Sequence, residues 1–170
     1  MNLSTMILKM SEGLGNTCAI FFLTLLFSLP LGMVFALLRM SKSKVVSSVM
    51  RFIISILRGT PLMLQLMVVY FGPFYLFGMN IGKWRFPAII TGFALNYGAY
   101  FAEIYRSGIV SMDRGQYEAA KLLGYSKGQT FVRIILPQVV KRILPAITNE
   151  VITLVKDTSL AFVLGIMEMF

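Results

Sequence analysis

The chain has 170 residues, 57% of them hydrophobic, and a mean hydropathy of +0.78. Such a composition is too apolar for a soluble domain of this size, so the expected solvent is a lipid bilayer. The net charge is +9, with 16 basic and 7 acidic residues and no histidine, which excludes histidine catalysis and histidine metal sites. The single cysteine, Cys18, excludes an intrachain disulfide.

The first long apolar run, residues 17–38, is uncharged and predicts a membrane span, because about 20 apolar residues cross ~30 Å of hydrocarbon. Residues 39–58 follow with five basic side chains and no acidic one. This bias places the segment on the cytoplasmic side and the N-terminus outside, and it favours a membrane-proximal role over nucleic-acid binding. Within the segment, residues 51–58 are amphipathic and are expected to lie along the inner membrane surface.

Two further apolar runs predict a second span over residues 61–77 and a third over residues 86–104. Thr60 and Pro61 are expected to cap and begin the second span. The third span carries small residues at every fourth position, an arrangement that lets two membrane helices approach closely. These packing positions are Ala94, Gly98 and Ala102.

The fourth predicted span, residues 143–167, contains charged residues that fall on one stripe of a helix. A charge at the bilayer centre costs at least ~2.5 kcal/mol, so the stripe must face water, a partner or its own counter-charges. In one interpretation Lys156 pairs with Glu150, Asp157 or a neighbouring helix, and the stripe packs against another subunit. In the other the stripe lines a pathway, with the acids meeting an ammonium group and the lysine a carboxylate. The stripe consists of Asn149, Glu150, Thr153, Lys156 and Asp157.

Between the third and fourth spans, residues 116–137 form the most polar long segment, on the cytoplasmic side of the predicted topology. Strong helix formers begin at Glu118, and Gly124 supplies a left-handed stop. Ser126 is expected to cap a second helix, with Gln129 in the capping-box position. The residue before Pro137 is expected to leave helical geometry and close the unit.

Residues of this loop are similar to the EAA loop of ABC-importer permease subunits, a family of all-α integral membrane proteins. The resemblance is carried by Glu118, Ala119, Ala120, Gly124, Ile134, Leu136 and Pro137. It implies that the loop couples the permease to a cytoplasmic ATPase. It also implies five core spans, of which four lie in this chain, so the chain is expected either to be incomplete at its C-terminus or to depart from the family pattern.

Two other segments resemble the polar amino-acid, histidine- and glutamine-type branch of that family: residues 58–62 and residues 156–160. The resemblance implies a bacterial inner-membrane importer with a second permease subunit, two ATPases and an external binding protein. ATP and magnesium would be bound by the ATPase, since the chain has no G-x-x-x-x-G-K-[ST] loop, and no enzyme activity or cofactor is expected here.

Two other classes of membrane protein account for less of the sequence. A stand-alone secondary transporter or channel would need more spans, usually as inverted repeats, and no repeat is visible. A non-transport membrane scaffold explains the small-residue face but leaves the polar stripe without a purpose. Within the same class, a permease for glycine betaine or another small solute remains an alternative.

Overall fold

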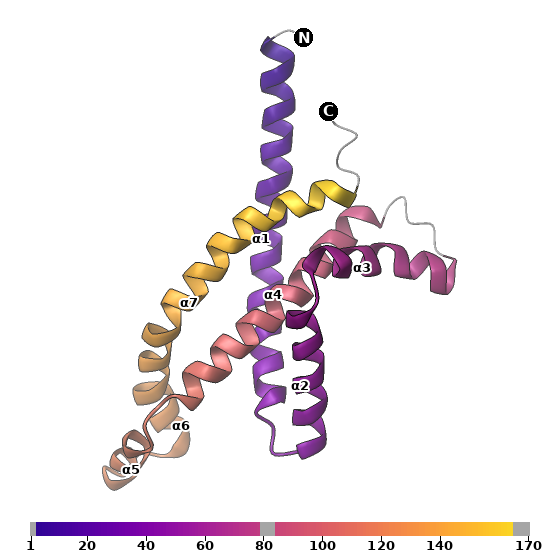
Figure 1. The fold of residues 1–170 in the computed structure, drawn as a ribbon. Coiled ribbons are helices and arrows are strands. Elements are labelled where there is room, and N and C mark those ends of the chain that lie inside the picture. Colours follow the sequence, from indigo (N-terminus) through magenta and orange to yellow (C-terminus); the bar gives the residue numbers. More distant parts are fainter. Residues whose placement is uncertain (1–2, 79–83, 165–170) are drawn as a thin grey trace.

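The computed structural model describes residues 3–78 and 84–164, and every regular element in those two ranges is helical (Figure 1). The prediction of an all-α protein is confirmed. Residues 165–167 of the expected fourth span lie outside the described ranges. The helices are α1 (Leu3–Arg39), α2 (Lys44–Gly59), α3 (Leu62–Phe77), α4 (Arg85–Val110), α5 (Arg114–Leu122), α6 (Lys127–Thr130) and α7 (Leu136–Asp157), with a π-helical turn η1 (Phe131–Ile135) before α7 and a 3-10 segment η2 (Thr158–Leu164) after it.

Helix α4 is the centre of the fold. In Figure 1 it runs between α7 and α2, and α1 lies along it over much of its length. Its aromatic side chains are the largest fully enclosed groups of the core, with Phe93 and Phe101 at 0% exposure and Tyr97 at 2%. A helix covered on several sides by other helices must be apolar or small around most of its circumference, and α4 fits this description.

Glycines in α4 mark the places where three other helices come closest. A Cβ atom added to Gly92 would lie 2.7 Å from Leu66 of α3, and one added to Gly98 would lie 3.2 Å from Leu31 of α1. One added to Gly108 would lie 2.3 Å from Ile143 of α7. The missing side chains therefore set the spacing of α4 from each neighbour.

The contact between α1 and α4 is tight from both sides. A Cβ atom on Gly32 of α1 would lie 2.7 Å from the Phe101 Cβ atom, 3.0 Å from the Gly98 carbonyl oxygen and 3.2 Å from the Ala102 backbone nitrogen. The structure thus places Gly98 and Ala102 against α1, and Ala94 on the same helix is 5% exposed.

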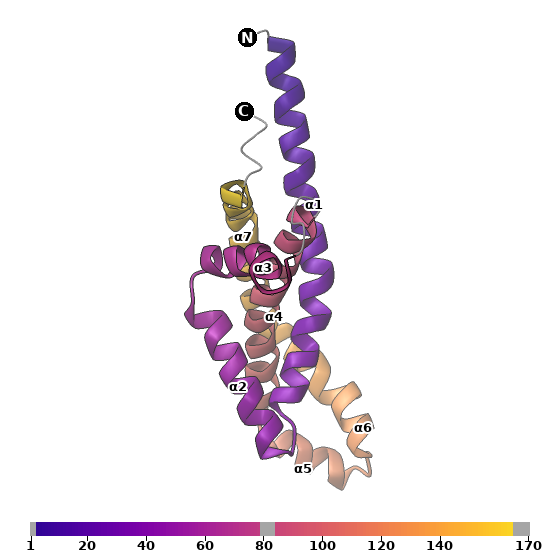
Figure 2. The same ribbon diagram turned by 90° about the vertical axis from the view of Figure 1, so that its right-hand side faces the viewer.

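Helices α2 and α3 meet at a bend of 108°, and the pair qualifies as a membrane span only when it is counted as one broken span. By length and composition alone, one described helix qualifies by itself: Gly13–Arg39 within α1. In both views α2 runs back alongside α1 rather than across it (Figures 1 and 2). The expectation that residues 51–58 lie along the membrane surface is therefore wrong for a bilayer crossed by α1. The buried face of Met50 and Ile54 holds α2 against the bundle instead.

The caps at this bend also differ from expectation. Pro61 is the N-cap residue of α3, and Thr60 closes α2. The Ile56 carbonyl in the last turn of α2 accepts both the Thr60 N–H, at 3.1 Å, and the Thr60 hydroxyl, at 2.8 Å.

The prediction that Leu136 leaves helical geometry is wrong. Leu136 has φ −57° and ψ −45°, and the helix continues through Pro137. The preceding turn is π-helical, so the Leu136 N–H donates to the Phe131 carbonyl, five residues back. A proline ring strikes the carbonyl four residues earlier in a regular α-helix, and the wider turn gives that ring room.

Helix α7 begins earlier than the predicted fourth span and ends its α-helical part at Asp157. The chain then tightens into η2. The hydroxyls of Thr158 and Ser159 donate to the carbonyls of Val155 and Lys156, each at 2.7 Å. These side-chain bonds satisfy carbonyls that lose their α-helical partners when the helix narrows.

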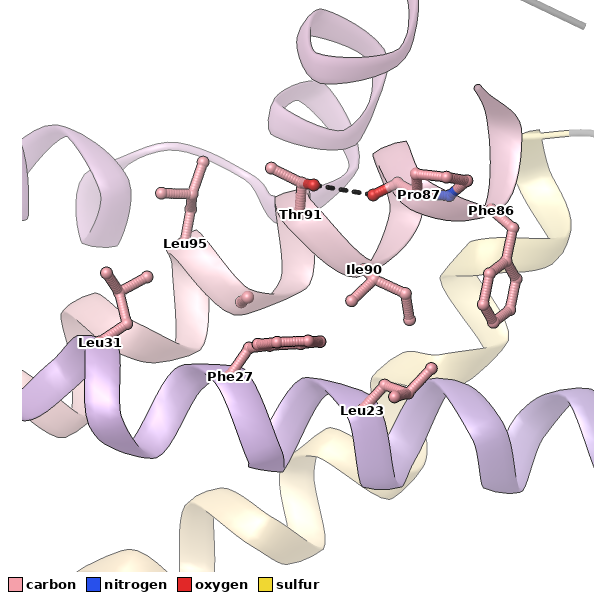
Figure 3. A pocket seen from close by; sticks show the side chains of 9 residues that line it. Leu23, Phe27, Leu31, Phe86, Pro87, Ile90, Thr91 and Leu95 are labelled. Atoms are coloured by element: carbon pink, nitrogen blue, oxygen red, sulfur yellow. Dashed lines mark hydrogen bonds between the residues drawn. The ribbon is translucent and has the colours of Figure 1, made fainter. Parts of the chain in front are cut away.

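The α1–α4 interface opens into an apolar pocket of about 430 Å³ (Figure 3). Leu23 and Phe27 of α1 face Ile90 of α4 across it. The Thr91 hydroxyl donates to the Pro87 carbonyl at 2.8 Å, so this polar atom is satisfied within its own helix. The pocket suits hydrocarbon and offers no group to a polar ligand.

The close contact at Gly32 can be tested by adding one methyl group. Gly32→Ala places a Cβ atom against backbone and Cβ atoms of α4 that cannot rotate away. We expect destabilisation of about 1–3 kcal/mol, measured as a lower melting temperature of the purified protein in detergent. The control is Gly15→Ala, whose new methyl group meets nothing within 4 Å and should leave stability equal or higher. Equal melting temperatures for the two variants would contradict the packing argument.

Candidate functional site

A band of polar side chains follows α4 between α2 and α7. We define the polar band as Arg58, Tyr97, Tyr100, Glu150 and Asp157. The Tyr97 hydroxyl donates to Asp157 Oδ2 at 2.7 Å, which links α4 to the end of α7. On the other flank, the Arg58 guanidinium carbon lies 5.0 Å from the centre of the Tyr100 ring, a cation–π contact between α2 and α4. Glu150 lies within Coulombic range of Arg58 and of Asp157.

The predicted stripe of α7 is divided by the structure. Glu150, Thr153 and Asp157 are partly buried on the side of the bundle, whereas Asn149 and Lys156 are exposed. The Thr153 hydroxyl donates a hydrogen bond to the Asn149 carbonyl of its own helix at 3.0 Å. Lys156 makes no ion pair with any of the residues described, so the pairing with Glu150 or Asp157 that the packing interpretation offered is not seen there. The acids thus face α4, and the lysine lies at the outer edge of the stripe.

Two side-chain amides hold the bend between α2 and α3. Gln65 Nε2 lies 2.7 Å from the Leu57 carbonyl oxygen and 2.7 Å from Thr60 Oγ1. Asn96 of α4 donates to the same Leu57 carbonyl and to Gln65 Oε1, each at 3.0 Å. A sharp bend frees carbonyls that cannot be left unpaired in a bilayer, and these amides satisfy them. We call this group the amide clamp: Leu57, Thr60, Gln65 and Asn96.

The clamp also positions the polar band. Leu57 immediately precedes Arg58, and Asn96 immediately precedes Tyr97. Fixing the Leu57 carbonyl against Asn96 therefore fixes the backbone from which the Arg58 and Tyr97 side chains project.

The loop between α4 and α7 folds as two helices joined at a glycine, as predicted. The Asp113 side chain caps α5 by accepting from the Gly115 N–H at 2.8 Å. Gly124 has φ +79°, a left-handed conformation that other residues adopt at a cost. Ser126 and Gln129 form the predicted capping box at the start of α6, with bonds of 2.9 and 3.3 Å.

The loop exposes leucines, although it is otherwise polar. Leu122 is 89% exposed and Leu123 is 75% exposed, immediately before the glycine turn. Ala120 is 1% exposed, whereas Glu118 and Ala119 face outward. The two alanines therefore differ in role: Ala120 lies inside the loop, and Ala119 contributes to its outer surface. The predicted Leu136 and Pro137 are also exposed, at the start of α7.

A family model described as "Binding-protein-dependent transport system inner membrane component" matches residues 28–170. The chain belongs to this family. Among its relatives, the arginine transport system permease protein ArtQ of Bacillus subtilis is 42% identical over 91% of the chain and 70% of its own length. The L-cystine transport system permease protein TcyB of the same organism is 38% identical over 95% of the chain and 68% of its own length.

A solved structure, described as the crystal structure of an amino acid ABC transporter with histidines, also matches this chain. The TM-score is 0.82 at 36% identity, over 97% of the chain and 77% of the matched chain. Both the fold and the membership in an inner-membrane family are therefore established.

For this member of the family, sequence reasoning missed the amide clamp and the contact of Arg58 with Tyr100. Neither contact has a signal in the local sequence, because each joins residues of different helices. Gln65 and Asn96, for example, are 31 residues apart. The ion pair of Glu103 with Arg106, in contrast, has the i,i+3 spacing that marks neighbours on a helix.

The amide clamp predicts that Gln65→Met destabilises the bend. Methionine has a similar length but no amide, so the Thr60 hydroxyl oxygen loses a donor and the Asn96 amide loses the Gln65 Oε1 acceptor. We expect a loss of about 1–3 kcal/mol in the free energy of unfolding. The measurement is thermal unfolding in detergent. Gln138→Met is the matched control, since the Gln138 side chain is exposed and bonds mainly to its own helix. A loss at Gln138 as large as that at Gln65 would contradict the clamp.

Proposed function

We propose that this chain is the permease subunit of an ATP-driven importer for polar amino acids. The observation that carries the proposal is the family match over residues 28–170, joined to a fold similarity with an amino acid ABC transporter at a TM-score of 0.82. The relatives named for arginine and cystine transport support an amino acid as the substrate class.

In this proposal the subunit pairs with a second permease copy or a paralogue, stands on cytoplasmic ATPases that bind ATP and magnesium, and receives substrate from an extracytoplasmic binding protein. Four spans cross the bilayer within this chain, with the N-terminus outside and the EAA loop in the cytoplasm. The polar residues of α4 and α7 lower the hydropathy of those helices, which is the expected property of spans that line a pathway. The broken α2–α3 pair supplies the second crossing.

The loop of α5, Gly124 and α6 is the coupling element. Glu118 is placed to meet a basic group of the ATPase, and Ala119 keeps the outer surface of α5 slim enough for a cleft. Ala120 packs inside, and the left-handed Gly124 sets the angle to α6. Leu136 and Pro137 lead from the loop into α7. A movement of the ATPase is thereby transmitted to a transmembrane helix.

The substrate pathway follows the α7 stripe. Glu150 and Asp157 offer carboxylates to an amino-acid ammonium group, with Asn149 and Thr153 beside them as polar lining. The Tyr97 hydroxyl holds Asp157 in place. Lys156, exposed and without an ion pair in the described ranges, is available to a substrate carboxylate. An acid and a base on one stripe match a zwitterion.

ATP-driven uptake tests the function and the pathway together. The transporter, purified through this chain with its ATPase and reconstituted into liposomes, should import a polar amino acid when supplied with its binding protein and ATP. Glycine betaine should not be imported. Lys156→Met should abolish uptake while the subunits still co-purify, and the exposed Lys141→Met at the other end of α7 should not. Full uptake by Lys156→Met would remove that residue from the pathway; the absence of an associated ATPase would refute the permease assignment.

The coupling role predicts the effect of Gly124→Val. A β-branched residue at φ +79° costs roughly 1–2 kcal/mol, so the loop relaxes and the angle between α5 and α6 changes. We expect ATP hydrolysis to continue while substrate-stimulated hydrolysis and uptake are lost. Gly124→Asn should retain more coupling, since asparagine tolerates left-handed geometry.

The control for the coupling test is Gly128→Val, because Gly128 has an ordinary helical backbone and nothing lies within 4 Å of its added Cβ atom. Normal coupling in the Gly124→Val variant would show that the left-handed turn does not matter.

A further inference from the structure

A cleft of about 340 Å³ lies where the end of α1, the second half of α2 and the middle of α4 come together. No residue of α7 lines it, although it shares Arg58 with the polar band, and its lining is strongly basic. The residues that line the cleft, which we call the basic cleft, are Arg39, Arg51, Ile54, Ser55, Arg58, Gly59 and Glu103.

The charge in the basic cleft is not balanced by the described part of the protein. Its one acidic residue, Glu103, is paired with Arg106, which donates to it through Nε at 2.9 Å and through a second nitrogen. Arg39, Arg51 and Arg58 form no ion pair with any described residue. Three guanidinium groups around one small volume repel one another, and an anion of the right size would relieve that repulsion.

Two of the three arginines are held in place by neighbours. Arg39 donates to Ser47 Oγ at 3.3 Å, and the Ser47 hydroxyl in turn donates to the Arg39 carbonyl at 2.7 Å. Arg58 stacks over Tyr100. The third, Arg51, projects from the next turn of α2 after Ser47, and Ser55 adds a hydroxyl one turn further on. Planar guanidinium donors fixed in this way suit a tetrahedral oxyanion such as phosphate.

The neighbouring face of α2 is apolar and open to the outside of the subunit. Val45, Val49, Phe52 and Ile56 recur at helical spacing and are exposed, with Phe52 at 68%. The basic cleft therefore adjoins a hydrocarbon-compatible stripe on the same helix. An anionic head beside an acyl chain is the chemistry of an anionic phospholipid, and basic pockets between helices on the cytoplasmic side are where such head groups bind.

We propose that the basic cleft binds the phosphate group of an anionic phospholipid of the inner leaflet. Arg39 and Arg51 contact the phosphate, Arg58 adds charge at the upper end of the cleft, and the acyl chains lie along the apolar stripe of α2. The positive bias of residues 39–58, which sets the inside orientation of the chain, supplies this binding charge as well.

Native mass spectrometry of the delipidated protein in detergent tests the site. Phosphatidylglycerol, phosphatidylcholine with the same acyl chains, and inorganic phosphate are titrated separately. We expect phosphatidylglycerol to bind more tightly than phosphatidylcholine, and Arg51→Gln and Arg39→Gln each to weaken its binding by about fivefold. The control is Lys44→Gln, which removes one positive charge from α2 outside the cleft and should change lipid binding little. Arg58 is left unchanged because it also belongs to the polar band.

Several outcomes would overturn the proposal. The first is equal affinity for the two lipids, and the second is an equal loss of lipid binding in Lys44→Gln and Arg51→Gln. The third is inorganic phosphate binding as tightly as phosphatidylglycerol, a result that would assign the cleft to a soluble anion. Competition by a free amino acid but not by phosphate would assign it to the transport pathway. Melting temperatures separate loss of binding from loss of fold, and Arg51→Lys should retain intermediate affinity because it keeps the charge without the planar fork.

Discussion

The close approach of α1 to α4 is the constraint on which the rest of the structure depends. Between helices in a bilayer there is no large hydrophobic gain, so association relies on close van der Waals packing. Gly32 provides that packing from one side and Gly98 from the other. Because α1 covers one face of α4, the helices α2, α3 and α7 pack against the remaining faces of α4. The polar residues of α4 can then point only toward those flanks.

The polar groups of the bundle follow from this division. Asn96, Tyr97 and Tyr100 would be costly on a lipid-facing surface, yet each has a partner on a neighbouring helix: the Leu57 carbonyl, Asp157 and Arg58. Each contact therefore joins two helices and also orients a polar side chain of α4. The clamp at Leu57 is the clearest case, since it repairs a broken helix and fixes the backbone beside Arg58.

Features that depend on neighbouring residues were predictable from the sequence. The α5–Gly124–α6 turn and its capping box are local, because Ser126 and Gln129 are three residues apart, and a left-handed turn needs glycine. The α2–α3 bend and the division of the α7 stripe were not predictable. They depend on contacts such as Tyr97 with Asp157, which are 60 residues apart, and no periodicity records which face meets which helix. The prediction that the helix ends before Pro137 was wrong for a related reason. The π turn that makes room for the proline ring forms in the folded segment and has no signature in the local sequence.

Continuous helix connects the proposed coupling loop to the polar band. Helical backbone continues from Lys127 through η1 and α7 to Asp157, without an intervening loop. Midway along this stretch Ile143 is packed against Gly108 of α4, and at its end Asp157 accepts a hydrogen bond from Tyr97 of α4. In the proposed coupling mechanism, a force on the loop would act on a helix held against α4 at two points, and the π turn is where the winding of that helix departs from a regular α-helix. Rotation of α7 about these points would shift Glu150 and Asp157 relative to Arg58, a displacement that fits the proposed role of the α7 stripe as a substrate pathway.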